Sequence, residues 1–72
     1  SPALSAEVRS RLEATGASVL DLHLWRLGPG HHAAIVVLEA PDSWPVNQYH
    51  ARLKGLEGLS HVTIEVRGPS AT

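Results

Sequence analysis

The hydrophobic pattern of this chain changes to a two-residue period near residue 19. Between residues 19 and 25, aliphatic side chains alternate with polar or aromatic ones, as in a β-strand with one buried face. Gly28-Pro29-Gly30 ends this segment, and a second apolar segment, residues 33–39, follows at once. Two strands joined by such a turn form a β-hairpin, in which opposed positions sum to 58. The predicted aliphatic pairs are Leu20 with Leu38, Leu22 with Val36, and Leu24 with Ala34.

Two helices and a third strand are expected around this hairpin. Leu4, Val8 and Leu12 recur at helical spacing, which predicts a helix over residues 2–15 that Gly16 ends. A second helix is expected from Val46, with apolar residues at positions 46, 49, 53 and 56. Glycine at position 55 weakens this helix, and glycine at position 58 ends it. The last strand, over residues 61–66, alternates again between apolar and polar side chains.

The order of these elements predicts an α+β fold. A strand, a helical crossover and a next strand of one sheet connect in a right-handed, parallel manner. The third strand is therefore expected beside the second, so that the chain forms an αββαβ sandwich. Its three-stranded mixed sheet carries both helices on one face. We expect one domain over residues 1–67 and a flexible tail over residues 68–72.

The opposite face of the predicted sheet has no helix left to cover it. Ile35, Val37 and Trp25 form an apolar patch there, and we expect a second copy of the chain as its cover. The side chains predicted on this face are Asp21, His23, Trp25, His31, Ile35, Val37, His61, Thr63 and Glu65.

The size of the chain also favours an external source of stability. A folded chain of 72 residues removes only roughly 60% of its unfolded surface from water, so oligomerisation or metal binding is expected. The absence of cysteine excludes disulfides and thiolate zinc sites. Any metal ion must therefore be bound by nitrogen and oxygen.

Charge and composition argue against two classes of partner. A formal net charge of −1, with two Trp and one Tyr, offers little for binding nucleic acid. The longest strongly apolar run, Ala33 to Leu38, is far shorter than the ~20 residues that span a bilayer. The chain also begins without Met or a leader sequence, so we expect it to be part of a longer protein.

Histidine is the one residue type in clear excess, with five copies. His23 is either a metal ligand on the uncovered face or a histidine that packs at a dimer contact. Consecutive strand residues point to opposite faces, so His31, and not His32, is the candidate ligand on the uncovered face. The alternative is that both are solvated turn residues. His50 flanks the buried stripe of the second helix, as a ligand or as a partly exposed polar residue.

The last strand places His61 and Glu65 on one face, ~13 Å apart along the strand. They cannot bind one ion together without a bend or a second chain. His23 and Glu65 are similarly separated by the middle strand. If these residues share a metal ion, the ion must lie between two subunits or at the edge of the domain. The alternative is that they simply form a polar outer face.

No catalytic arrangement is expected. A nucleophile needs an adjacent base that a third group orients, and Asp21 and His23 are predicted to lie too far apart along their strand to form such a pair. Gly28-Pro29-Gly30 joins two strands instead of opening a helix, so it is not a phosphate-binding loop.

Two segments carry a family resemblance. The run DLHLWRLGPGHHAAIVVLEA, residues 21–40, and the closing SHVTIEV, residues 60–66, resemble the C-terminal cytoplasmic domain of the cation diffusion facilitator transporters. Within that family the chain looks most like the branch that exports cobalt, nickel and related divalent ions. Several relatives carry histidine at the positions of Glu65 and Val37, and this chain does not.

The resemblance implies a ferredoxin-like fold, similar to a metallochaperone, in a V-shaped homodimer. It also implies divalent transition metal ions (zinc, cobalt, nickel or cadmium) at or near the dimer interface, which draw the two arms together and favour efflux by a transmembrane domain. The domain would lie on the cytoplasmic side of a bacterial inner membrane. The residues at or beside the family's ligand regions are His23, His50, His61 and Glu65.

Two other functions fit the same pattern. The chain could be a dimerisation scaffold of the same transporter that does not depend on metal, or a ferredoxin-like sensor that binds an organic molecule between two copies. Metal titration distinguishes these possibilities. Imidazole binds metal only in its neutral form, so any metal affinity should fall as pH drops through about 6.5.

Overall fold

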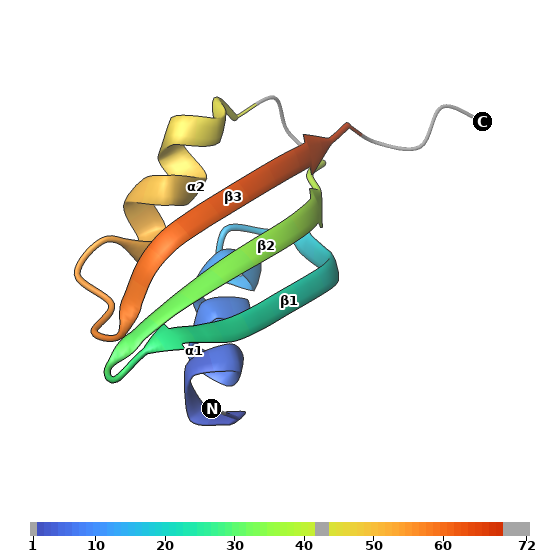
Figure 1. Cartoon of the computed structure of the whole chain (residues 1–72). Helices are drawn as coiled ribbons and strands as arrows, with labels where there is room; N and C mark the ends of the chain where they lie inside the picture. The colour runs from blue at the N-terminus through green and yellow to red at the C-terminus, as the bar shows by residue number, and fades with distance from the viewer. Residues whose placement is uncertain (1, 42–43, 69–72) are drawn as a thin grey trace.

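The change of hydrophobic period near residue 19 coincides with the change from helix to strand in the structure. The computed structural model describes residues 2–41 and 44–68. Its element order is α1, β1, β2, α2, β3 (Figure 1). The bounds are α1 Pro2–Glu13, β1 Ser18–Gly28, β2 His31–Glu39, α2 Val46–Leu53 and β3 Leu59–Arg67. The predicted αββαβ order is therefore confirmed.

The three strands form one mixed sheet in the order β1-β2-β3. Strands β1 and β2 are antiparallel, as a hairpin requires, and β2 and β3 are parallel, as a helical crossover requires. Figure 1 shows both helices on the same side of this sheet. Helix α1 packs on β1, α2 packs on β3, and the two helices contact each other. The predicted three-stranded sheet with one helix-covered face is confirmed.

The core lies between the helices and the sheet. Its buried residues come from both helices, from β1 and β2 and from the adjoining loops, and β3 contributes partly buried apolar side chains that pack against them. Tyr49, Leu12 and Leu38 are its largest fully buried side chains. The buried cluster comprises Val8, Leu12, Ala17, Val19, Ala34, Val36, Leu38, Ala40, Tyr49 and Leu53.

The hairpin register confirms two of the three predicted pairs. Leu22 lies opposite Val36 and Leu24 opposite Ala34. The predicted pair of Leu20 with Leu38 is wrong, because a β-bulge inserts one extra residue between Val19 and Asp21. Val19 takes the position opposite Leu38 and is buried, whereas the side chain of Leu20 is 50% exposed.

Helix α2 is shorter than expected. It ends at Leu53, and Lys54 already has extended backbone angles, with φ −63° and ψ 137°. Gly55 follows with φ +81°, a conformation that favours glycine. The prediction that this helix continues to Gly58 was therefore wrong. A turn at Lys54 and Gly55 and a second turn at Glu57 and Gly58 connect α2 to β3.

The predicted flexible tail, residues 68–72, lies outside the described residues except for Gly68. Within the part of the chain that the structure describes, no helix has the length and apolar character needed to cross a membrane.

Candidate metal-binding face

The sheet face opposite the helices, called the open face below, presents side chains from all three strands in register. Alternation along each strand places every second residue on this face, and direct partners on neighbouring strands point the same way. Ile35 and Trp25 are each 43% exposed here. The strand registers align three rows across β1, β2 and β3: Asp21, Val37 and Glu65; His23, Ile35 and Thr63; Trp25, Ala33 and His61.

His23 and Asp21 form a polar contact on the open face. Nε2 of His23 lies 3.0 Å from Oδ2 of Asp21, and both side chains are mostly exposed. The two side chains therefore lie closer together than the strand spacing predicted, although this contact is not one of the hydrogen bonds found within the described residues. Two Cα atoms at positions i and i+2 are ~6.6 Å apart, but their side chains share a face and can lean together. Asp21 is thus a functional candidate that sequence reasoning missed, although its spacing from His23 was the available signal.

This contact defines how His23 could bind a metal ion. Nε2 is the ring nitrogen that faces Asp21, and a neutral imidazole with its proton on Nε2 keeps a free lone pair on Nδ1. Metal-binding histidines commonly have this arrangement, in which a carboxylate orients the ring and makes it a better ligand. The contact thus occupies Nε2 of His23 and leaves Nδ1 free of Asp21.

One copy of the chain does not complete a metal site on this face. Two inter-strand spacings of ~4.8 Å separate the β1 residues from His61 and Glu65 on β3, and Ile35 lies between. Glu65 accepts a hydrogen bond from Nε of Arg67 at 2.8 Å. Within residues 2–41 and 44–68, no three His, Asp or Glu side chains are grouped closely enough to hold one ion.

His31 and His32 are bound to the start of β3. Nδ1 of His31 lies 2.8 Å from Oγ of Ser60, and Nδ1 of His32 lies 3.2 Å from the carbonyl oxygen of Gly58. Only Nε2 of His31 is left as a ligand atom. The pair of His31 and Ser60 does not form a catalytic dyad of the usual kind, because no hydrogen bond among the described residues orients the imidazole from its other nitrogen.

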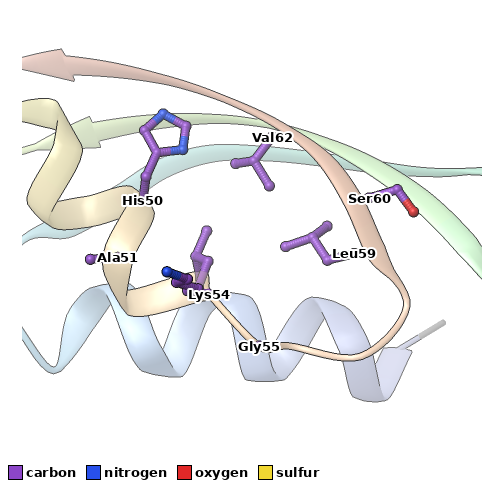
Figure 2. Close-up of a pocket in the computed structure, with 8 residues that line it drawn as sticks. His50, Ala51, Lys54, Gly55, Leu59, Ser60 and Val62 are labelled. Atoms are coloured by element: carbon purple, nitrogen blue, oxygen red, sulfur yellow. The ribbon is translucent and has the colours of Figure 1, made fainter.

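His50 lies apart from the other proposed ligands. It is half-buried on α2 and lines an open groove of about 400 Å³ between the end of α2 and the start of β3 (Figure 2). Val62 lines the same groove, so by alternation His61 points to the opposite side of β3. The structure thus keeps His50 and His61 on opposite sides of the strand.

The fold and the open face define a ferredoxin-like αββαβ domain with imidazole and carboxylate groups on its uncovered sheet. No protein-family model matches the sequence. No curated protein matches it either.

Several solved structures share this fold. The nickel form of a variant of the MamM CTD superposes with a TM-score of 0.76 at 11% identity, covering 97% of this chain and 100% of that chain. A second MamM CTD variant gives a TM-score of 0.75 at 11% identity, with 96% and 98% covered. A third gives 0.75 at 11%, with 96% of each chain covered. MamM is a member of the cation diffusion facilitator family. At these identities the likeness establishes the fold of a MamM C-terminal domain, and function is a separate question.

Proposed function

We propose that this chain is the cytoplasmic regulatory domain of a cation diffusion facilitator. In this proposal it homodimerises and binds divalent transition metal ions. Metal binding then controls efflux of those ions by the transmembrane domain of the full-length protein, at the cytoplasmic face of a bacterial inner membrane. The shared fold with the MamM C-terminal domain supports it, and so does the nickel form among the similar structures. The resemblance of residues 21–40 and 60–66 supports the cobalt, nickel and zinc branch.

The observation that carries this proposal is the set of imidazole and carboxylate side chains on the open face. His23, His61 and Glu65 all lie on this face, yet no three such groups are close enough within the described part of one chain. Ligands from two copies complete the coordination of an ion. Nitrogen and oxygen donors suit zinc, cobalt, nickel and cadmium. His50 and His31 are the remaining proposed ligands, and His50, which lies on the helix side of β3, would bind an ion at a different position from the open face.

The second copy is proposed to shield the apolar centre of the open face. Ile35 and Trp25 occupy adjacent rows there, and both are exposed in the single chain. An ion whose ligands come from both copies binds the closed dimer more tightly than the open one. It shifts the population only by that difference in affinity. This linkage converts the metal concentration into a change of dimer shape.

Calorimetric titration of zinc and nickel into chelator-treated protein tests the proposal. We expect micromolar binding that weakens at least ten-fold when His23 and His61 are both replaced by alanine. His32→Asn is the matched control, since asparagine can keep a hydrogen bond to the Gly58 carbonyl. Affinities weaker than millimolar, unchanged in the double variant, would contradict metal regulation.

One observation favours a second candidate function. Because the described residues of one chain contain no group of three ligands, the domain would also suit a dimerisation scaffold that does not use metal. In that case the dimerisation constant would be the same in the presence of a chelator and of zinc. The same samples, measured by sedimentation equilibrium, distinguish the two functions.

A further inference from the structure

The two edges of the sheet differ in how they are protected. An edge strand exposes unpaired N–H and C=O groups, and β-bulges are one means of preventing unwanted pairing. Strand β1 has two register shifts, at Leu20 and at Leu27. Strand β3 has one register shift, at Ser60, and none between His61 and Arg67. The β3 edge is therefore the edge at which another strand can pair in regular register.

The backbone groups available at this edge follow from the parallel ladder. The N–H of Ala40 donates to the carbonyl oxygen of Arg67 at 2.9 Å, so the backbone groups of Arg67 point towards β2. Alternation then turns the N–H and C=O groups of Val62, Ile64 and Val66 outward. Within the described part of the chain, no hydrogen bond engages these outward groups. They form a row of donors and acceptors with the spacing of a strand.

The groove lies beside the start of this row. Its apolar side chains, called the apolar floor below, are Leu53, Leu59 and Val62, and polar groups of His50, Lys54 and Ser60 also line it. Figure 2 shows His50 and Lys54 on the α2 side of the groove and Leu59, Ser60 and Val62 on the β3 side. A groove of about 400 Å³ between a helix and a free strand edge accommodates an extended segment, whose alternate side chains enter the groove.

The charge of the groove selects the kind of segment. No carboxylate lines it, and α2 contains no acidic residue. Lys54 forms no ion pair within the described residues. The last carbonyl groups of α2 carry a partial negative charge, which makes this a poor site for a free anion. Affinity must therefore come from main-chain pairing, with Lys54 favouring an acidic side chain.

We infer that the β3 edge and the groove beside α2 bind an extended, acidic peptide segment of a partner protein by strand addition. The peptide main chain pairs with Val62 and Ile64. Aliphatic side chains of the peptide contact the apolar floor, and a carboxylate contacts Lys54. This site lies at the strand edge, on the helix side of β3, so it is distinct from the open face and needs no metal ion.

The test uses a capped, fluorescein-labelled peptide of alternating valine and glutamate, at physiological ionic strength and with chelator present. Fluorescence polarisation should detect saturable binding. Amide signals of Val62 and Ile64 should shift in NMR spectra, and their hydrogen exchange should slow. Binding should weaken at least ten-fold in Lys54→Glu and stay within two-fold in Lys54→Arg. Arg26→Glu, with the same charge change at the far edge, should also stay within two-fold.

Two further peptides keep the test independent of how well the variants fold. A valine and lysine peptide of the same length should bind at least ten-fold more weakly. A valine and glutamate peptide with alternate amide nitrogens methylated should also lose binding, because methylation blocks strand pairing and leaves the charge unchanged. Any of three results would overturn the inference. The methylated peptide could bind as well as the unmethylated one, Lys54→Glu and Arg26→Glu could lose binding equally, or Val62 and Ile64 could show no response. None of these outcomes depends on zinc, so they leave the proposed metal function to its own test.

Discussion

Nε2 of His23 lies 3.0 Å from Oδ2 of Asp21, two residues earlier on the same strand face. Both side chains are more than half exposed, so the contact adds less than ~1 kcal/mol to the free energy of unfolding. Its main effect is therefore on orientation. The contact leaves Nδ1 of His23 free of Asp21, and in the proposed function Nδ1 would be the atom that binds the metal ion.

Replacing Asp21 by alanine tests this orientation. We expect zinc affinity to fall by roughly ten-fold or more, because an unoriented imidazole must be ordered when it binds. The melting temperature should hardly change, since the pair is exposed. Calorimetry and thermal unfolding of the same sample measure both effects. Glu57→Ala, which removes an exposed carboxylate from the loop after α2, is the control and should leave zinc affinity unchanged. An equal loss in both variants would mean that Asp21 acts only through net charge.

Metal binding should depend on pH in the direction set by histidine protonation. An imidazole must lose its proton to bind metal, and free histidine protonates near pH ~6.5. Zinc affinity should therefore fall by roughly ten-fold per histidine ligand for each pH unit below that value. Titration at several pH values measures the slope. The slope should become shallower in His23→Ala, and a slope that is unchanged there would remove His23 from the ligand set.

The bulge at Leu20 predicts unequal effects of two leucine substitutions. Leu38 is fully buried, so Leu38→Ala should lower the free energy of unfolding by ~2–5 kcal/mol. Leu20 is 50% exposed, so Leu20→Ala should change it by only about 0.5 kcal/mol. Urea unfolding of both variants measures the difference. Similar losses would indicate the regular register, in which these two residues face each other.

Dimerisation across the open face should shield Trp25. Trp44, the second tryptophan, packs against Tyr49 and Arg52 on the helix side, so Trp44→Phe isolates the fluorescence of Trp25. In that variant, acrylamide should quench the emission strongly in dilute, metal-free protein and weakly in concentrated protein with zinc. Quenching that is independent of concentration and zinc would place the dimer contact away from this face.

The sequence pattern predicted those parts of the fold that depend on alternation. Leu22 and Leu24 face their predicted partners because one face of the hairpin must be buried. The pattern did not locate the bulge, because Val19 and Leu20 are adjacent aliphatic residues and either satisfies the alternation. The end of α2 was also missed. Periodicity continues to Leu56, but the backbone of Lys54 is already extended.

The candidate site was predicted only in part, for similar reasons. Strand parity placed His23, His61 and Glu65 on one face, and the strand registers place them there. The contact between His23 and Asp21 was missed because Cα spacing was taken for the separation of side-chain atoms. The groove beside Lys54 depends on where α2 ends and β3 begins. Neither boundary follows from hydrophobic spacing alone.

The most direct test of the proposed function is the oligomeric state of the purified chain with and without zinc, measured by sedimentation equilibrium over a wide concentration range. The proposal predicts a dimer whose dissociation constant falls at least ten-fold when zinc is added, and a smaller effect in the His23 and His61 double variant. A chain that stays monomeric at high concentration with zinc present would contradict it, because the ligands on the open face would then have no second copy to complete their coordination.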